Sequence, residues 1–154
     1  MKKILFATLI AVIVSGTAVA NEKIPVNYQV TKSFEKEFSG AKSVSWETLV
    51  GEDIYHAVFI YNNERMNAYF NAEGKLLAKS RYIVNENLPM LVSKRITEGF
   101  NAYSVFQSME YVTASGTSYI VTLENEKSRI CIRAVGNGSF RIIKKEKKNN
   151  MAKL

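Results

Sequence analysis

The sequence predicts an α+β protein built from two tandem repeats, with the helices packed on one face of the sheet. Each repeat is expected to be a helix followed by an antiparallel β-meander of about four strands. Three observations support this prediction. Matching residues recur at an offset of 62 to 64 positions, apolar residues four apart open each half, and alternating segments separated by turn-forming residues follow.

The recurrence of residues along the chain indicates a duplicated unit. The apolar residues of 30–38 match those of 92–100 at an offset of 62, and Gly74 matches Gly138 at an offset of 64. The offset grows because the second half is longer before its second strand. An ordered series of this kind indicates a repeated supersecondary unit. The remaining matches are Tyr55 with Tyr119, Ala57 with Val121, Phe59 with Leu123, Met66 with Ile130, Ala68 with Ile132 and Phe70 with Ala134.

A short helix is expected at the start of each half. The apolar spacing predicts these helices over 30–38 and 92–100. Gly40 is placed to end the first helix, because glycine readily adopts the backbone conformation that follows a helix. Pro89 suits the first turn of the second helix, where its missing N–H group costs nothing.

Strands are expected over the rest of each half. Alternating residues mark them, and turn formers such as Asn62-Asn63 and Gly136-Asn137-Gly138 separate them. Short loops between consecutive strands indicate antiparallel hairpins. The expected strands cover 43–49, 54–61, 65–70, 76–83, 105–112, 118–123, 129–135 and 140–143.

The alternation also divides the side chains between two faces of the sheet. The face under the helices should hold the core. The opposite face is apolar and aromatic for a surface in water, so it is expected either to be covered or to recognise a ligand. The expected core residues are Val44, Trp46, Tyr55, Ala57, Phe59, Met66, Ala68, Phe70, Tyr119, Val121, Leu123, Ile130, Ile132 and Ala134. The expected residues of the opposite face include His56, Val58, Ile60, Asn67, Tyr69, Ile120, Thr122, Cys131 and Arg133.

The N-terminal segment is typical of a secretory signal peptide. Lys2 and Lys3 precede an apolar run over 4–14, and Ala18-Val19-Ala20 forms a small-x-small cleavage motif. The sequence therefore predicts cleavage after Ala20 and a periplasmic location. The expected organisation is a signal peptide over 1–20, repeats over 21–87 and 88–143, and a basic tail over 144–154.

The net charge of +7 is concentrated outside the predicted sheet. Residues 21–140 carry 13 basic and 13 acidic side chains, so this part is neutral. Nucleic-acid binding normally needs basic residues on a folded face, so no nucleic-acid partner is expected. The tail is expected to be a solubilising end, with weak contact to an anionic surface as the alternative. The tail lysines are Lys144, Lys145, Lys147 and Lys148.

Residues for catalysis are scarce. His56 is the only histidine and Cys131 the only cysteine, so a multi-histidine metal site and an intrachain disulfide are both excluded. These two residues fall on the same predicted face, but no orienting Asn or Asp stands beside them. The acidic residues are scattered over helix surfaces and turns rather than paired. The sequence predicts no enzyme activity, no catalytic residue, no metal site and no cofactor.

A set of residues spread over most of the chain after residue 20 forms a recognisable pattern. It consists of the helix end Phe34-Glu35-Lys36-Glu37-Phe38, then Val44-Ser45-Trp46, Tyr55, Phe59, Asn67-Ala68-Tyr69-Phe70, Gly74 and Leu88-Pro89. The pattern resembles the PepSY-like family of exported bacterial proteins, which are described as beta-lactamase-inhibitor-like. The second half departs from it, because Ser108 stands where Trp46 stands in the first. The resemblance implies tandem units that share a concave sheet, and a protein-binding or inhibitor-like role.

Two functions stay open for the face opposite the helices. The expected role of this face is to hold another envelope protein or a peptide. The alternative is that the groove between the repeats binds a small molecule or peptide. The expected binding residues are His56, Val58, Ile60, Tyr69, Tyr82, Tyr111 and Arg133.

Overall fold

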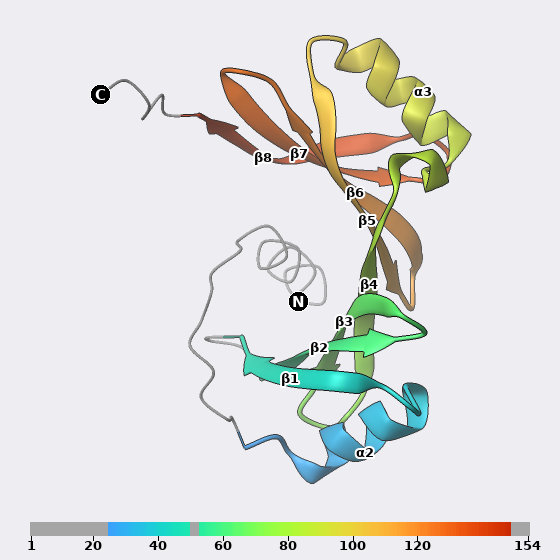
Figure 1. The fold of residues 1–154 in the computed structure, drawn as a ribbon, viewed down its shortest axis with the longest axis vertical. Helices are drawn as coiled ribbons and strands as arrows, with labels where there is room; N and C mark the ends of the chain where they lie inside the picture. The colour runs from blue at the N-terminus through green and yellow to red at the C-terminus, as the bar shows by residue number, and fades with distance from the viewer. Residues whose placement is uncertain (1–24, 50–52, 149–154) are drawn as a thin grey trace.

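The computed structural model describes residues 25–49 and 53–148, and the predicted signal peptide and its cleavage site lie outside them. Two α-helices, a short 3-10 helix and eight strands are formed (Figure 1). In the first part of the chain these are α2 (Tyr28–Glu37), β1 (Lys42–Thr48), β2 (Ile54–Tyr61), β3 (Glu64–Asn71) and β4 (Leu76–Ile83). They are followed by η1 (Asn85–Asn87), α3 (Met90–Gly99), β5 (Ser104–Thr113), β6 (Gly116–Glu124), β7 (Ser128–Val135) and β8 (Phe140–Lys147).

All strands belong to one antiparallel sheet, in the order β1 to β8 along the chain. The predicted fold of two tandem helix-plus-meander repeats is therefore wrong as an architecture. Strand β4 pairs with β5 over six residue pairs, from Ala78 with Thr113 to Ile83 with Ser108. This pairing satisfies the N–H and C=O groups that an edge strand would leave unpaired. Periodicity identifies single strands but does not say which of them pair.

The helices lie at opposite ends of the molecule (Figure 1), each over its own half of the sheet. Helix α2 buries Val30 and Phe34, and helix α3 buries Val92 and Ile96, as their four-residue spacing predicts. Most of the core residues expected beneath them are buried, and Trp46, Tyr55, Met66 and Tyr119 are half-buried against the same cores. Ala57, Phe59, Ala68 and Phe70 are buried with α2, and Val121, Leu123, Ile130, Ile132 and Ala134 are buried with α3.

The two helix-covered cores differ in composition. The α2 core is aromatic, with the ring of Phe34 5.2 Å from Trp46 and 4.8 Å from Phe59, both edge to face. Such geometry adds to the stabilisation that burial of the rings gives. The core under α3 is mainly aliphatic, and Ser108 is buried there and donates a hydrogen bond to Asn85. The helices therefore meet their halves of the sheet through different packing.

Two expectations about β1 and β8 need correction. Val44 was expected in the core but is exposed. The register between β1 and β2 shifts between Lys42 and Ser45, and Ser43 has a φ of 52°, so simple alternation fails there. Strand β8 continues past the predicted end at residue 143, so the first lysines of the expected tail are strand residues.

Two hairpin turns lie directly against the helices. Gly74, between β3 and β4, has a φ of +78°, and a Cβ there would lie 2.5 Å from the carbonyl oxygen of Gln29. Gly138, between β7 and β8, has a φ of +83°, and a Cβ there would lie 2.9 Å from the carbonyl oxygen of Leu91. In both turns, glycine permits a left-handed backbone and a close approach to a helix.

The Gly74→Ala substitution should lower the free energy of unfolding by about 1–3 kcal/mol, because it adds backbone strain and a clash with a helix carbonyl. Gly136→Ala is the matched control, since a Cβ there meets nothing within 4 Å. Urea unfolding of both variants measures the difference. An equal loss of stability in the two variants would contradict the close packing of this turn.

Candidate binding face opposite the helices

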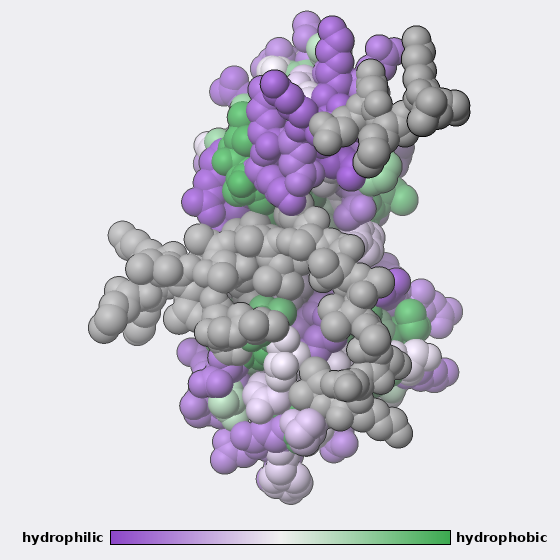
Figure 2. Space-filling model, turned by 90° about the vertical axis from the view of Figure 1, so that its left-hand side faces the viewer, coloured by the Kyte–Doolittle hydropathy of each residue, from purple (hydrophilic) through white to green (hydrophobic). Residues whose placement is uncertain are grey.

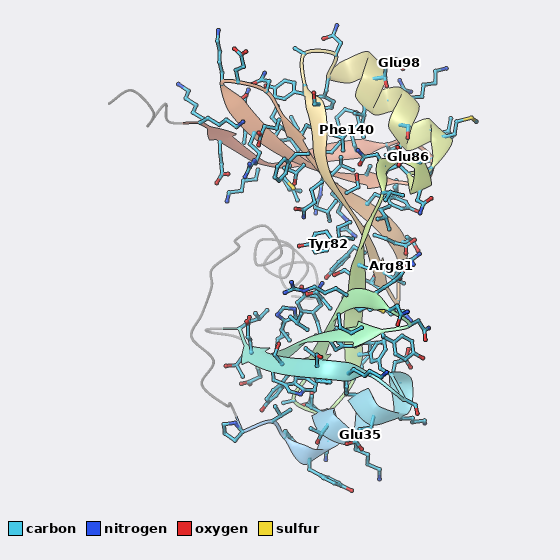
Figure 3. All side chains as sticks on the ribbon, viewed as in Figure 1. Glu35, Arg81, Tyr82, Glu86, Glu98 and Phe140 are labelled. Atoms are coloured by element: carbon cyan, nitrogen blue, oxygen red, sulfur yellow. The ribbon has the colours of Figure 1, made fainter. Side chains whose placement is uncertain are left out.

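The alternation of side chains along β4 identifies the second face of the sheet. Lys79 on β4 contacts Glu37 of α2, and Ile83 packs into the core under α3. The even-numbered positions, which alternate with Lys79 and Ile83 along β4, therefore point away from both helices. Figure 3 labels Arg81 and Tyr82, which leave β4 in opposite directions, Tyr82 toward the helix-free face. We use "helix-free face" for the sheet surface that includes His56, Tyr69, Tyr82, Tyr111 and Arg133.

The centre of the helix-free face is buried rather than open. It forms a third apolar cluster, to which Leu77 and Ile143 add partly buried side chains. Its largest members, Tyr69 and Tyr111, come from β3 and β5, with ring centroids 6.4 Å apart. The apolar character noted in the sequence is thus explained in part by packing. The buried members of this cluster are Leu49, Ile54, Tyr69, Ala78, Met109, Tyr111, Ile120 and Cys131.

His56, on β2, lies between neighbours on β1 and β3. Its ring stacks on Tyr69, with centroids 4.6 Å apart and planes 5° apart, and its Nε2 lies 3.1 Å from Oδ1 of Asn67. Its Nδ1 lies 3.5 Å from Oε2 of Glu47 but makes no hydrogen bond. Burial lowers the pKa of His56, and this effect outweighs the opposing influence of Asn67 and Glu47. The ring is therefore neutral near pH 7.

The buried tyrosines carry polar atoms into the cluster. Burial raises the pKa of both Tyr69 and Tyr111, so both phenols keep their protons. In the described part of the chain, the Tyr111 hydroxyl and the Oγ of Ser80 are buried without a hydrogen-bond partner. A buried polar atom without a partner is unusual in folded proteins.

Arginines border this cluster on β7. Arg133 Nε donates to Oγ of Ser118 at 3.1 Å, and that hydroxyl donates to the backbone oxygen of Tyr111 at 3.4 Å. Arg129 Nε donates to Glu124 at 2.8 Å, and its guanidinium lies 4.6 Å from the ring centroid of Phe106. The Phe106 ring thus has a cation above it, an arrangement that stabilises an exposed aromatic side chain.

A cavity of about 250 Å³ opens on this face in the β5–β8 half. The exposed aromatic residues Tyr82 and Phe106, with 49% and 57% of their surface accessible, form part of its wall. Figure 2 views the molecule from the side and shows mainly hydrophilic side chains over the upper, β5–β8 half. The remaining lining residues are Gln107, Met109, Ile120, Thr122, Arg129, Cys131, Lys144 and Glu146.

The structure brings some of the expected binding residues together. His56 contacts Tyr69, Tyr69 lies beside Tyr111, and Ser118 connects Tyr111 to Arg133. Val58 and Ile60 are half-buried on β2, apart from the residues that line the cavity. Tyr82 lies on β4 and belongs to the cavity wall, two strands away from the expected residues on β2.

Sequence reasoning missed Phe106 and Arg129. The register between β5 and β6 shifts between Val105 and Gln107, so Phe106 and Gln107 both reach the cavity. No residue pattern marks this bulge. Arg129 could have been found, because it stands two residues before Cys131 and four before Arg133 in the alternation of β7.

His56 and Cys131 are too far apart in the sheet to act together as a catalytic base and nucleophile. They lie on β2 and β7, with four strands of the sheet between them. Burial raises the pKa of Cys131, which makes its thiol less reactive. Within residues 25–49 and 53–148, no group of three or more His, Cys, Asp and Glu side chains could hold a metal ion.

A second cavity, of about 310 Å³, lies on the helix side of the sheet between β3, β4 and the end of α2. Its charges are already paired. Arg81 donates to Glu110 at 2.9 Å and to Glu64 at 2.7 Å, and Lys79 lies 3.5 Å from Glu37. The charged side chains of this cavity are therefore engaged with one another.

The fold defines an α+β protein with a BLIP-like sheet. The structure resembles that of a BLIP-like protein from Bacteroides fragilis, with a TM-score of 0.66 and 17% identity over 85% of this chain and 94% of that one. It also resembles a DUF2874 family protein from Bacteroides ovatus, with a TM-score of 0.68 and 17% identity over 85% and 92%. A third similar structure is that of a protein from Bacteroides eggerthii proposed to be periplasmic. Its TM-score is 0.68, with 12% sequence identity over 79% of this chain and 88% of that one.

At these identities the likeness establishes the fold alone. No family model matches the sequence, and no curated protein matches it. The resemblance to the PepSY-like family is therefore not confirmed, whereas a BLIP-like fold is supported. In the ranges that the structure describes, no helix is long and apolar enough to cross a membrane.

The buried His56 predicts a defined pH dependence of stability. Its pKa in the folded protein is below the ordinary value of 6.5, so on acidification the unfolded chain takes up a proton first. The free energy of unfolding should fall as pH drops through about 6.5 and level off below the folded-state pKa.

The His56→Gln variant should lose less stability than the parent between about pH 8 and about pH 5, because glutamine does not titrate and still can bond to Asn67. Urea unfolding at several pH values checks this expectation. Parallel pH curves for the parent and the variant would show that His56 does not carry the effect.

Proposed function

We propose that this chain is an exported, non-catalytic binding protein that holds another envelope protein through its helix-free face. The observation that carries the proposal is the pair of exposed aromatic side chains, Tyr82 and Phe106, at the rim of a cavity on that face. An exposed aromatic pair beside a hollow is typical of a protein-binding surface, since large rings bury much area at low entropic cost.

The chemistry around the pair supports the same proposal. The Arg129 guanidinium lies over the ring of Phe106, and Arg133 stands further along the same face on β7. Tyrosine and arginine are enriched among the residues that dominate binding energies. Tyr69 and Tyr111 belong to the buried cluster whose members Met109 and Ile120 line the cavity. His56, Val58 and Ile60 extend the proposed surface over the β2 side.

The fold likeness supports the proposal by analogy. One of the similar structures is BLIP-like, and a beta-lactamase-inhibitor-like role is what the sequence resemblance implied. Fold does not determine function, so the analogy sets only a direction for experiments. A periplasmic location, reached after cleavage at Ala20, is part of the proposal, and the likeness to a protein proposed to be periplasmic supports it.

A small molecule or peptide in the cavity is the second candidate. The volume of about 250 Å³ and the mixed lining, with Met109 and Ile120 beside Arg129 and Lys144, favour a small amphipathic ligand. This volume is just below the usual range of small-molecule sites, about 300–1,000 Å³, which makes the protein partner the first choice.

Contact with an anionic surface through the basic C-terminal residues is a weaker proposal. Lys144 pairs with Glu146 at 2.6 Å, and Lys148 pairs with Glu124. Lys145 and Lys147 are exposed on the edge strand β8 and would supply most of such an attraction. It would be weak and strongly salt-dependent.

The aromatic rim should decide whether a partner is bound. Tyr82→Ala and Phe106→Ala are each expected to weaken capture of an envelope protein by about thirtyfold, since each removes a large contact side chain. Pull-down of exported, tagged protein from its own envelope extract, quantified by mass spectrometry, measures this. Tyr28→Ala is the matched control, because Tyr28 is as exposed but lies on α2.

The outcomes separate the candidates. A partner lost in both rim variants and kept in the control supports the protein-binding function, and a partner kept in all variants contradicts it. Native mass spectrometry of the purified protein tests the second candidate. A co-purifying small molecule that disappears with Phe106→Ala would favour the ligand carrier.

A further inference from the structure

One row of side chains crosses the helix-free face from β4 to β8. The register pairs Tyr82 with Met109, Met109 with Ile120, Ile120 with Arg133, and Arg133 with Arg141. Directly paired residues in antiparallel strands have neighbouring side chains on the same face. The row therefore begins with an exposed aromatic ring, continues over two apolar residues and ends in two adjacent arginines.

The arginine pair is unfavourable by itself. Like charges directly opposite each other destabilise a sheet. Burial and the positive charge of Arg141 both lower the pKa of Arg133, and the two residues are directly paired across β7 and β8. The strands are held together in spite of this repulsion.

No carboxylate relieves the repulsion in the part of the chain that the structure describes. Arg81 and Arg129 each have an acidic partner there, but neither Arg133 nor Arg141 lies within 4.0 Å of one. Among residues 25–49 and 53–148, the only side-chain partner of Arg133 is the neutral hydroxyl of Ser118. Two positively charged side chains thus lie side by side on the sheet, and none of the described residues supplies a negative charge to pair with them.

The neighbours of Arg133 orient it. Nε is occupied by Ser118, which is in turn bonded to the backbone of Tyr111. The outer N–H groups of the guanidinium remain available, and such a planar group binds a carboxylate through two parallel hydrogen bonds. The Tyr111 hydroxyl, buried without a partner, adds a further polar group below the row.

We propose that Arg133 and Arg141 form a binding site for a carboxylate, supplied by an aspartate or glutamate side chain of the partner protein. The proposal rests on the proposed function, because the arginines continue the row that begins at the aromatic rim. A partner that presents an apolar side chain as well as an acidic one would match the exposed ring of Tyr82 together with the arginine pair. Charge complementarity selects an acidic segment over a basic or neutral one.

The first test uses an octaglutamate peptide as the probe and the exported protein purified from the periplasm. Arg133→Gln and Arg141→Gln are each expected to weaken its binding by about tenfold or more at low salt, measured by NMR titration of the arginine Nε–H signals and the backbone amides. Lys75→Gln is the control, since it removes the same charge from an exposed position in the β3–β4 turn beside α2, away from β7 and β8. It should change the affinity by less than about twofold.

The second test needs no ligand. Because the arginines repel each other, Arg141→Gln should raise the melting temperature, and the rise should shrink with added salt. Lys75→Gln, at an exposed turn position, should leave the melting temperature nearly unchanged. A lower melting temperature for Arg141→Gln would overturn the premise that the pair is strained.

The results distinguish failure of this inference from failure of the proposed function. Equal octaglutamate binding by Arg141→Gln and Lys75→Gln overturns the carboxylate site, even where the rim variants still lose a captured protein. Arginine-dependent octaglutamate binding supports the site, even where pull-down recovers no protein. Acetate serves as a comparison with octaglutamate. If acetate binds with the same dependence on the arginines and with the same affinity per carboxylate group, the site binds a free anion, and the choice of a protein side chain is overturned.

Discussion

The hydrogen-bonded pairing of β4 with β5 is the constraint on which the rest of the structure depends. It joins strands that lie on either side of η1 and α3 in sequence, and it makes one sheet of what would otherwise be separate meanders. The same pairing places Tyr82 beside Met109, and so aligns the aromatic rim with the arginines of the last strands. Without it, the helix-free face would not be continuous, and the cavity beside Tyr82 would lose a wall.

Much of the local structure was predictable from the sequence, because period and turn chemistry are local signals. The strands and the residues beneath each helix follow from alternation and four-residue spacing, as the burial of Phe59 and Val121 confirms. Strand partners depend on contacts between distant residues, so the continuous sheet was not predictable. Bulges broke the alternation at Val44 and Phe106. The PepSY-like resemblance implied a shared sheet, but the residues themselves did not.

The candidate site was predictable only in part. Alternation assigned Tyr69, Tyr111 and Arg133 to one face correctly, but it carries no information on depth, and the two tyrosines are buried there. The charge count suggested a free basic tail from residue 144, whereas pairing with β7 places Lys144 opposite Cys131. Arg141 became significant only through its register with Arg133, a relation that no count of charges contains.

The sheet is open, so β1 and β8 have edges without a neighbouring strand in the described structure. Both edges have features that oppose the docking of another strand. β1 is distorted at Ser43, and β8 is interrupted by a bulge opposite Cys131 and carries Lys145 and Lys147. Charged and irregular edges resist the strand-by-strand growth that leads to aggregates and fibrils. The lysines that the sequence assigns to a tail thus lie on an edge strand, where their charge opposes the addition of strands from other molecules.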